Sequence, residues 1–170
     1  MVMDILVRNE EPKDYRRVEE MTRAAFSYPD RIEQGGIGCS HARVITAERT
    51  IPVLNFGPIS VLPEYQRKGV GKALIRAMIQ KATRMGFGAI LFFGRPEYYP
   101  QFGFREASVW GITDENGSNY PAFMGMELIP GYLSEAKGGR YYESDIYDDD
   151  LNRQRVKEFD SIYCAQMCRI

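Results

Sequence analysis

The residues with the clearest chemical potential form one short run, Gln66-Arg67-Lys68-Gly69-Val70-Gly71-Lys72. Its glycines allow a tight turn and a close approach of a ligand to the main chain. An amphipathic helix is predicted to start within the run, and a helix N-terminus offers backbone N–H groups and a positive dipole end to an anion. The cations of the run lie at that same positive end, where an anion would offset their repulsion. The run therefore predicts a polyanion site.

Three other interpretations exist for this run. A solvated surface could carry the cations, since each exposed charge near a helix end changes stability by only ~0.3–1 kcal/mol. A nucleotide P-loop, G-x-x-x-x-G-K-[ST], needs a hydroxyl after its lysine, but Ala73 stands there and Gln66 occupies the first glycine position. The dinucleotide fingerprint G-x-G-x-x-G lacks its third glycine, which is replaced by Leu74. Both nucleotide sites are excluded by their own chemistry.

The elements around the run form a strand–helix–strand unit. Residues 51–56 predict a strand, residues 70–85 a helix closed by Gly86, and residues 89–93 a strand buried on both faces. Such a unit is a right-handed crossover between parallel strands. Gly57-Pro58 interrupts the first strand, because proline cannot donate a ladder hydrogen bond. A sheet that opens there would expose backbone groups of residues 59–61 to an extended ligand.

The rest of the chain adds shorter elements. Periodicity and turn residues predict one further helix near each end of the chain and strands between them. Residues 35–38 are predicted to be a flexible break. The strands are expected at residues 4–8, 41–46, 104–112, 122–128 and 138–142, and the helices at 12–26 and 149–167. No repeat or linker divides these elements, so residues 1–170 are predicted to form one domain.

Two motifs carry a resemblance to a known family. The run from Gln66 to Gly71 matches Q/R-x-x-G-x-G/A and resembles the cofactor motif of the GNAT superfamily of acyl-CoA-dependent N-acetyltransferases. The run from Pro96 to Phe104 looks like the Y-x-x-x-G-F element of that family and is similar to its YhbS-like branch. The resemblance covers about Val53 to Tyr147, together with the first strand and helix.

The resemblance implies a fold and a reaction. The implied fold is mixed α/β, with a largely antiparallel sheet, helices on both faces and a splayed parallel strand pair at the cofactor cleft. The implied reaction transfers an acetyl group from acetyl-CoA to a primary amine by direct attack. The alternative is a non-catalytic acyl-CoA-binding regulatory module, and a third reading is a phosphate-binding scaffold for protein partners.

The resemblance also implies roles for named residues. Backbone N–H groups of the glycine-bearing run would cradle the pyrophosphate, while residues 59–61 would pair with the pantetheine arm and hold the thioester carbonyl. Tyr99 would protonate the departing thiolate, and Tyr98 is expected to be a wall residue. The general base stays open between Glu97, Glu127 and water. The implied cofactor-binding residues are Ile59, Ser60, Val61, Gln66, Arg67, Lys68, Gly69, Val70, Gly71 and Lys72.

One feature departs from the family pattern. GNAT proteins usually place a second helix and a further strand after the first helix, but only about fifteen residues separate Ser27 from His41 here. That length is too short for both elements and their turns. The shortening affects the acceptor half, so the acceptor site is either open, completed by a partner subunit or inactive.

Composition limits the remaining classes of function. The formal net charge of −1 favours no nucleic-acid partner. The three cysteines lack the spacing of a disulfide framework, and the single histidine, His41, lacks partners at ligand spacing, so no metal is expected. No signal peptide or apolar run of ~18 residues is present, which predicts a cytoplasmic protein with no membrane contact. The amine acceptor, a small molecule or a peptide, stays unidentified, and a homodimer stays open.

Overall fold

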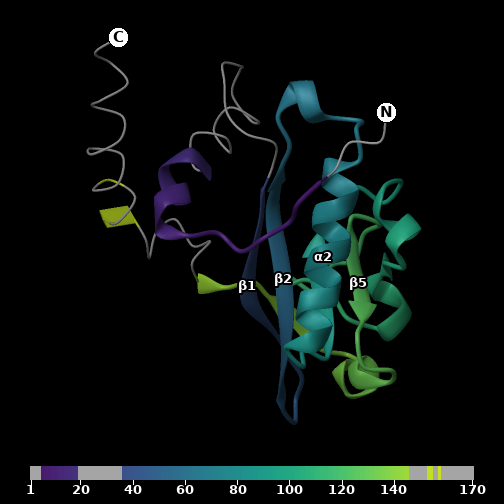
Figure 1. Cartoon of the computed structure of the whole chain (residues 1–170). Helices are drawn as coiled ribbons and strands as arrows, with labels where there is room; N and C mark the ends of the chain where they lie inside the picture. Colours follow the sequence, from purple (N-terminus) through teal and green to yellow (C-terminus); the bar gives the residue numbers. More distant parts are fainter. Residues whose placement is uncertain (1–4, 19–35, 146–152, 155–156, 158–170) are drawn as a thin grey trace.

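The fold is built on a six-stranded mixed sheet with the strand order β4-β5-β3-β2-β1-β6. The structure is a computed structural model that describes residues 5–18, 36–145, 153–154 and 157 (Figure 1). Every neighbouring pair of strands is antiparallel except β2 and β3, which confirms the predicted sheet type. The strands are β1 (Gly36–Ile45), β2 (Thr50–Ser60), β3 (Ala89–Phe93), β4 (Arg105–Glu106), β5 (Phe123–Glu127) and β6 (Arg140–Tyr142).

Helix α2 (Val70–Arg84) lies against one face of the sheet (Figure 1). Its buried side chains recur every three or four residues, as the predicted stripe required, and they pack on Leu54, Phe56 and Ile90. Gly86 follows with φ 83°, which confirms it as the residue that ends the helix. Met85 was predicted in the stripe but is 63% exposed, because it lies at the helix end.

The opposite face of the sheet carries a second core cluster. Val44, Val53 and Leu91 pack there against Ala107 of the 3₁₀ helix η4 (Ala107–Trp110) and Leu133 of η5 (Tyr132–Ala136). Both faces of the sheet are therefore covered, and in the described part of the chain the second face is covered by 3₁₀ helices rather than α-helices.

The predicted hairpin of residues 41–46 and 51–56 is confirmed, and it is longer than predicted. Strand β1 begins at Gly36 and pairs with Ser60, so the prediction of a flexible break is wrong for residues 36–38. The ladder shifts register between Ile37 and Cys39, opposite Gly57-Pro58. A Cβ at Gly38 would lie 2.9 Å from the Gly57 carbonyl oxygen, so the two backbones approach closely at this bulge. The predicted interruption at Pro58 is confirmed.

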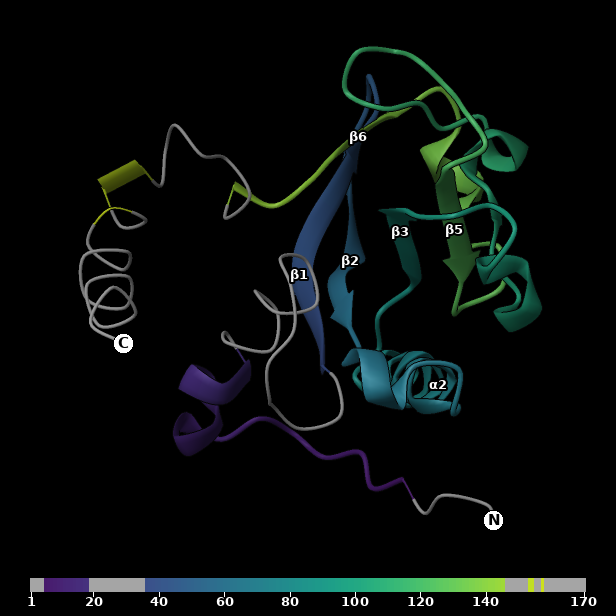
Figure 2. The same cartoon turned by 90° about the horizontal axis from the view of Figure 1, so that it is seen from above.

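Strands β2 and β3 separate soon after they meet. Their one register pair is Leu54 with Ile90, and Figure 2 shows β3 beside β2 in the sheet. Beyond the Gly57-Pro58 bulge, β2 stays paired with β1, where Ile59 pairs with Ile37. The predicted splayed parallel pair is confirmed.

Two predicted strands are wrong. Residues 5–8 form no strand; Arg8 donates to Asp14 at 2.6 Å, and the neighbouring Asn9 accepts from Lys81 of α2 at 2.6 Å, so this segment lies outside the sheet. In residues 104–112 only β4 is extended. The chain then buries Ala107 and Ile112 through the turn of η4 instead of through a strand.

The predicted terminal helices are seen only in part. The first starts with the 3₁₀ turn η1 (Pro12–Asp14) and continues as α-helix through residues 15–18. Residues 153, 154 and 157 are helical, as predicted for the last helix. Most of the shortened segment between Ser27 and His41 lies outside the described residues.

Candidate active site

The glycine-bearing run of residues 66–72, which we call the glycine turn, leads into α2. Gly69 is the N-cap of the helix with φ 94°, a left-handed conformation that favours glycine. Arg67 has φ 58°, which is uncommon for a residue with a side chain. The Gln66 side chain donates to the Val61 carbonyl at 3.0 Å and so ties the turn to the end of β2.

The backbone of the glycine turn leaves donors at the start of the helix. The first helical hydrogen bond runs from the Ala73 N–H to the Gly69 carbonyl at 3.0 Å. The N–H groups of the three residues between them have no acceptor within an α-helix. The cations around them, Arg67, Lys68 and Lys72, are exposed, and none is paired with a carboxylate of the described residues. Backbone donors, a helix dipole and three available cations suit a phosphate-bearing ligand.

Gly71 faces the tyrosine-rich loop. A Cβ placed on it would lie 3.5 Å from the Tyr98 hydroxyl oxygen and 3.7 Å from Cγ2 of Val61. The Tyr98 hydroxyl therefore lies beside the glycine turn, although Tyr98 follows it by more than twenty residues in the sequence. Sequence reasoning assigned Tyr98 to a wall, and no local pattern signalled its place beside the helix start.

The end of β2 borders the opening between β2 and β3. Ser60 is buried, and Ile59 and Val61 are half-buried. Strand β1 pairs with one edge of this segment, through Ile37 and Gly36. The other edge faces β3, with which the described register holds only at Leu54 and Ile90. Ile59, Ser60 and Val61 thus lie at the end of β2, where Gln66 ties the glycine turn to Val61.

Tyr99 packs against β2 and β3 on the α2 side of the sheet. Its ring is 8% exposed and lies edge-on to Phe92 of β3 and to Phe56 of β2, with centroids 4.6 and 5.7 Å apart. Burial raises the pKa of the Tyr99 hydroxyl, the nearby Tyr98 adds to this, and Arg95 opposes it. The hydroxyl stays protonated at neutral pH and has no hydrogen-bond partner among the described residues. It can act as a proton donor to a ligand.

The two carboxylates considered as general base differ in their contacts. Glu127 accepts the Leu133 N–H at 2.7 Å and so caps the start of η5. Glu97 is exposed on the loop that precedes Tyr99. A third carboxylate, Glu143, accepts a hydrogen bond from the Asn55 side chain. The sequence did not indicate this residue, because no motif links two residues so far apart.

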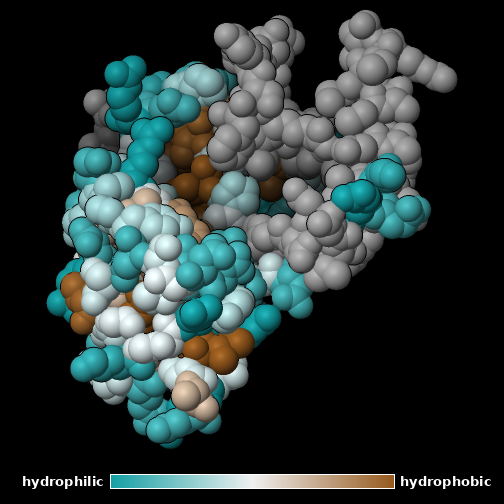
Figure 3. All heavy atoms as spheres, turned by 180° about the vertical axis from the view of Figure 1, so that it is seen from behind, coloured by the Kyte–Doolittle hydropathy of each residue, from teal (hydrophilic) through white to brown (hydrophobic). Residues whose placement is uncertain are grey.

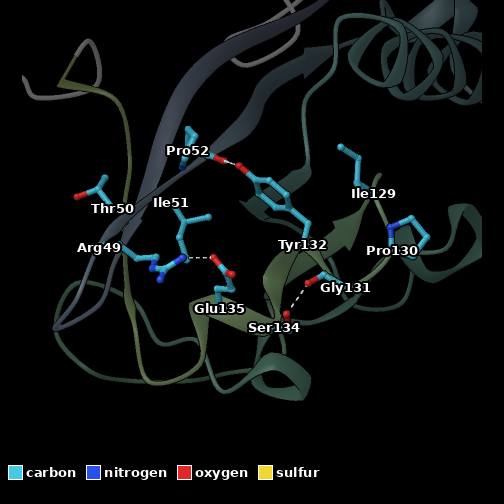
Figure 4. Close-up of a pocket in the computed structure, with 10 residues that line it drawn as sticks. All are labelled: Arg49, Thr50, Ile51, Pro52, Ile129, Pro130, Gly131, Tyr132, Ser134 and Glu135. Carbon is cyan, nitrogen blue, oxygen red and sulfur yellow. Dashed lines mark hydrogen bonds and ion pairs between the residues drawn. The ribbon is translucent and has the colours of Figure 1, made fainter.

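A separate pocket lies at the turn of the β1–β2 hairpin. It has a volume of ≈ 430 Å³, and Ile51, Pro52, Tyr132 and Glu135 are among the residues that line it (Figure 4). Its polar groups are occupied: Tyr132 donates to the Pro52 carbonyl at 2.8 Å, and Arg49 pairs with Glu135. None of the predicted site residues lines it, so it is distinct from the glycine turn.

Figure 3 and the side-chain clusters limit what else the described surface could bind. On the face behind the view of Figure 1, described residues are mainly hydrophilic, and apolar ones gather in small separate groups (Figure 3). Within the described ranges, no cluster of three or more His, Cys, Asp or Glu could hold a metal ion. In those ranges no helix has the length and apolar character needed to span a membrane.

Comparison with known proteins agrees with this geometry. Residues 30–106 match the model of the acetyltransferase (GNAT) domain. The uncharacterized N-acetyltransferase YjhQ of Escherichia coli K12 is 34% identical over 89 residues, which cover 51% of this chain and 49% of YjhQ. The chain thus spans about half the length of the curated relative it matches.

Two solved structures share the fold. The GNAT family N-acetyltransferase YhbS of Escherichia coli, solved with CoA, has a TM-score of 0.70 at 20% identity and covers 81% of this chain and 89% of its own. A GNAT acetyltransferase of Brucella melitensis, solved with acetyl-CoA, has a TM-score of 0.56 at 22% identity and covers 72% and 87%. Over about half of its length this chain is therefore similar to GNAT acetyltransferases, and it shares the fold of two solved members of that family.

Proposed function

We propose that this chain binds acetyl-CoA at the glycine turn and transfers its acetyl group to a primary amine by direct attack. The observation that carries the proposal is the position of the glycine turn, at the start of α2 and directly beside the opening between β2 and β3. One site would hold the phosphates, and the adjacent opening would take the acyl end of the same molecule.

The residues present fit the phosphate end of acetyl-CoA. The N–H groups of Val70, Gly71 and Lys72 are the orphan donors of the helix start, and three exposed cations surround them. Gly71 leaves the space beside the Tyr98 hydroxyl free of a Cβ, so a phosphate can approach the main chain there.

The chemistry at the acyl end follows from the opening. Bound acetyl-CoA supplies an activated acyl group and a thiol leaving group. Backbone N–H groups of Ile59, Ser60 and Val61 would stabilise charge that develops on the thioester oxygen as the amine attacks. Tyr99, held protonated by burial, would donate its proton to the departing thiolate. The acetyl group passes directly to the amine, without a covalent enzyme intermediate.

Thiol release tests the proposal. Purified protein is incubated with acetyl-CoA and a panel of primary amines, and free CoA thiol is measured against a blank without amine. We expect amine-dependent thiol release and an equimolar N-acetylated product by mass spectrometry. Binding of acetyl-CoA without release for every amine would contradict the enzyme and favour the acyl-CoA-binding module.

A further inference from the structure

A polar group of side chains lies on the sheet face opposite α2, beside the opening between β2 and β3. Leu54 and Ile90 are the last register pair and both belong to the core under α2. Side chains alternate along a strand, so Asn55 of β2 and Phe93 of β3 point to the opposite face. A ligand on that face would lie on the other side of the sheet from Tyr99, which packs under α2.

Asn55 is held there by a distant carboxylate. The Asn55 side chain is buried, with 3% exposure, and its Nδ2 donates to Oε1 of Glu143 at 3.2 Å. Glu143 directly follows β6, which pairs with β1 on the side away from β2. The contact therefore crosses β1, where the residues on this face, Ser40 and Ala42, are small enough to allow it.

A buried hydroxyl in the same place has no partner. Ser40 of β1 lies directly opposite Asn55 of β2. Ser40 is only 8% exposed, and its Oγ makes no hydrogen bond. A buried polar group without a partner costs free energy. Ser40 Oγ is enclosed, so the group of this cluster that a ligand can reach is the exposed carboxylate of Glu143.

Two exposed rings border the cluster. Phe93 is 39% exposed and Tyr120 41% exposed, and their rings are stacked with centroids 5.7 Å apart. Burial raises the pKa of Tyr120, and the charges of Asp114 and Glu143 add to this, so the hydroxyl lies within the field of Glu143. Phe93 is also edge-on to Tyr141, two residues before Glu143, at 5.8 Å. Exposed aromatic faces beside a carboxylate suit a cation attached to a ring.

We propose that this cluster is the acceptor site: Glu143, positioned by Asn55, binds the ammonium group of the acceptor, and Phe93 with Tyr120 contact a ring attached to it. The acceptor class is an arylalkylamine. The inference rests on the proposed function, because it identifies the amine that attacks the thioester after its ammonium form has lost a proton to water. The carboxylate forms an ion pair with the ammonium, and the ring excludes water from the contact.

Direct binding tests the inference independently of turnover. Binding of 2-phenylethylammonium is measured by calorimetric titration at pH 8, with the protein saturated with CoA and without CoA. We expect wild-type binding, and a loss of at least about tenfold in Glu143→Gln, the scale of one hydrogen bond to a charged group. Asp145→Asn, which removes a carboxylate that pairs with Arg43, is the matched control and keeps wild-type affinity.

Two further arms separate the components of the proposal. Ethylammonium should bind wild type at least several-fold more weakly than 2-phenylethylammonium, and Tyr120→Ala should reduce that difference. Equal affinity for both amines, or tighter binding of a lysine amide, would overturn the ring contact. Wild-type binding that Glu143→Gln leaves unchanged, or no amine binding at all, would overturn the site. Failure to bind acetyl-CoA would instead overturn the proposed function.

Discussion

The ring of Tyr99 stands edge-on to the ring of Phe92, with centroids 4.6 Å apart and planes at 78°. Phe92 belongs to β3, and Phe56 of β2 contacts the same tyrosine ring, so Tyr99 bridges the two strands where they part. Packing on both strands fixes the position of its hydroxyl. A rigidly held proton donor at the opening is what thiolate departure would require.

Tyr99→Phe is expected to lower kcat by ~10²–10⁴-fold, the usual contribution of a general acid. The ring and its packing remain, so the melting temperature should stay close to that of wild type. Steady-state kinetics and thermal unfolding check both expectations. Tyr132→Phe is the control, since it removes a hydroxyl that bonds only within the separate pocket. An unchanged kcat in Tyr99→Phe would contradict the acid role.

Gly69→Ala should damage both stability and cofactor binding. Its φ of 94° makes an alanine there unfavourable by roughly 1–2 kcal/mol. Gly86→Ala introduces similar strain at the other end of the same helix, where φ is 83°. Urea denaturation should show comparable losses in the free energy of unfolding for the two variants. Only Gly69→Ala should weaken acetyl-CoA binding, and equal weakening in both would show a general effect of stability.

Gly38→Ala should destabilise the bulge between β1 and β2. The new Cβ would lie 2.9 Å from the Gly57 carbonyl oxygen, so the backbone must shift, at a cost of about 1–3 kcal/mol. Cys39→Ala changes an exposed residue next to it and should cost far less. Chemical denaturation compares the two. Equal stability of Gly38→Ala and wild type would show that the two backbones do not meet as described.

Amine binding should depend on pH through Glu143. Burial raises the pKa of Glu143 above its usual value, the charge of Glu115 adds to this, and the Asn55 hydrogen bond opposes it. Tyr120, which lies in the field of Glu143, stays neutral over the same range because its own pKa is raised. KM for an amine should therefore fall as pH rises through the raised pKa, because the carboxylate forms. Glu143→Gln should remove this dependence, and a profile that persists would assign it to another group.

Local patterns predicted the cofactor half of the fold well. The apolar stripe of α2, the continuous apolar run of β3 and the Gly57-Pro58 break each depend on neighbours in sequence, so periodicity and turn chemistry were sufficient. The same reasoning failed at residues 5–8 and 104–112. There, an ion pair of Arg8 and the burial of Ala107 through a turn outweighed strand propensity.

The contact between Asn55 and Glu143 could not be predicted from the sequence. Asn55 and Glu143 are 88 residues apart, and they meet because β6 adds to the far side of β1. Strand β6 (Arg140–Tyr142) has only three residues, and its sequence does not specify which strand it pairs with. Tyr98 is a similar case, since its place beside Gly71 depends on how the loop after β3 folds back.

Calorimetric titration of acetyl-CoA into wild type and Gly71→Leu tests the central claim most directly. A Cβ at Gly71 would already contact the Tyr98 hydroxyl and Val61, so a larger side chain would crowd the glycine turn, and leucine is a good helix former. We predict saturable one-to-one binding by wild type and its loss in a Gly71→Leu protein that still unfolds cooperatively. No acetyl-CoA binding by wild type, or equal binding by both proteins, would contradict the claim.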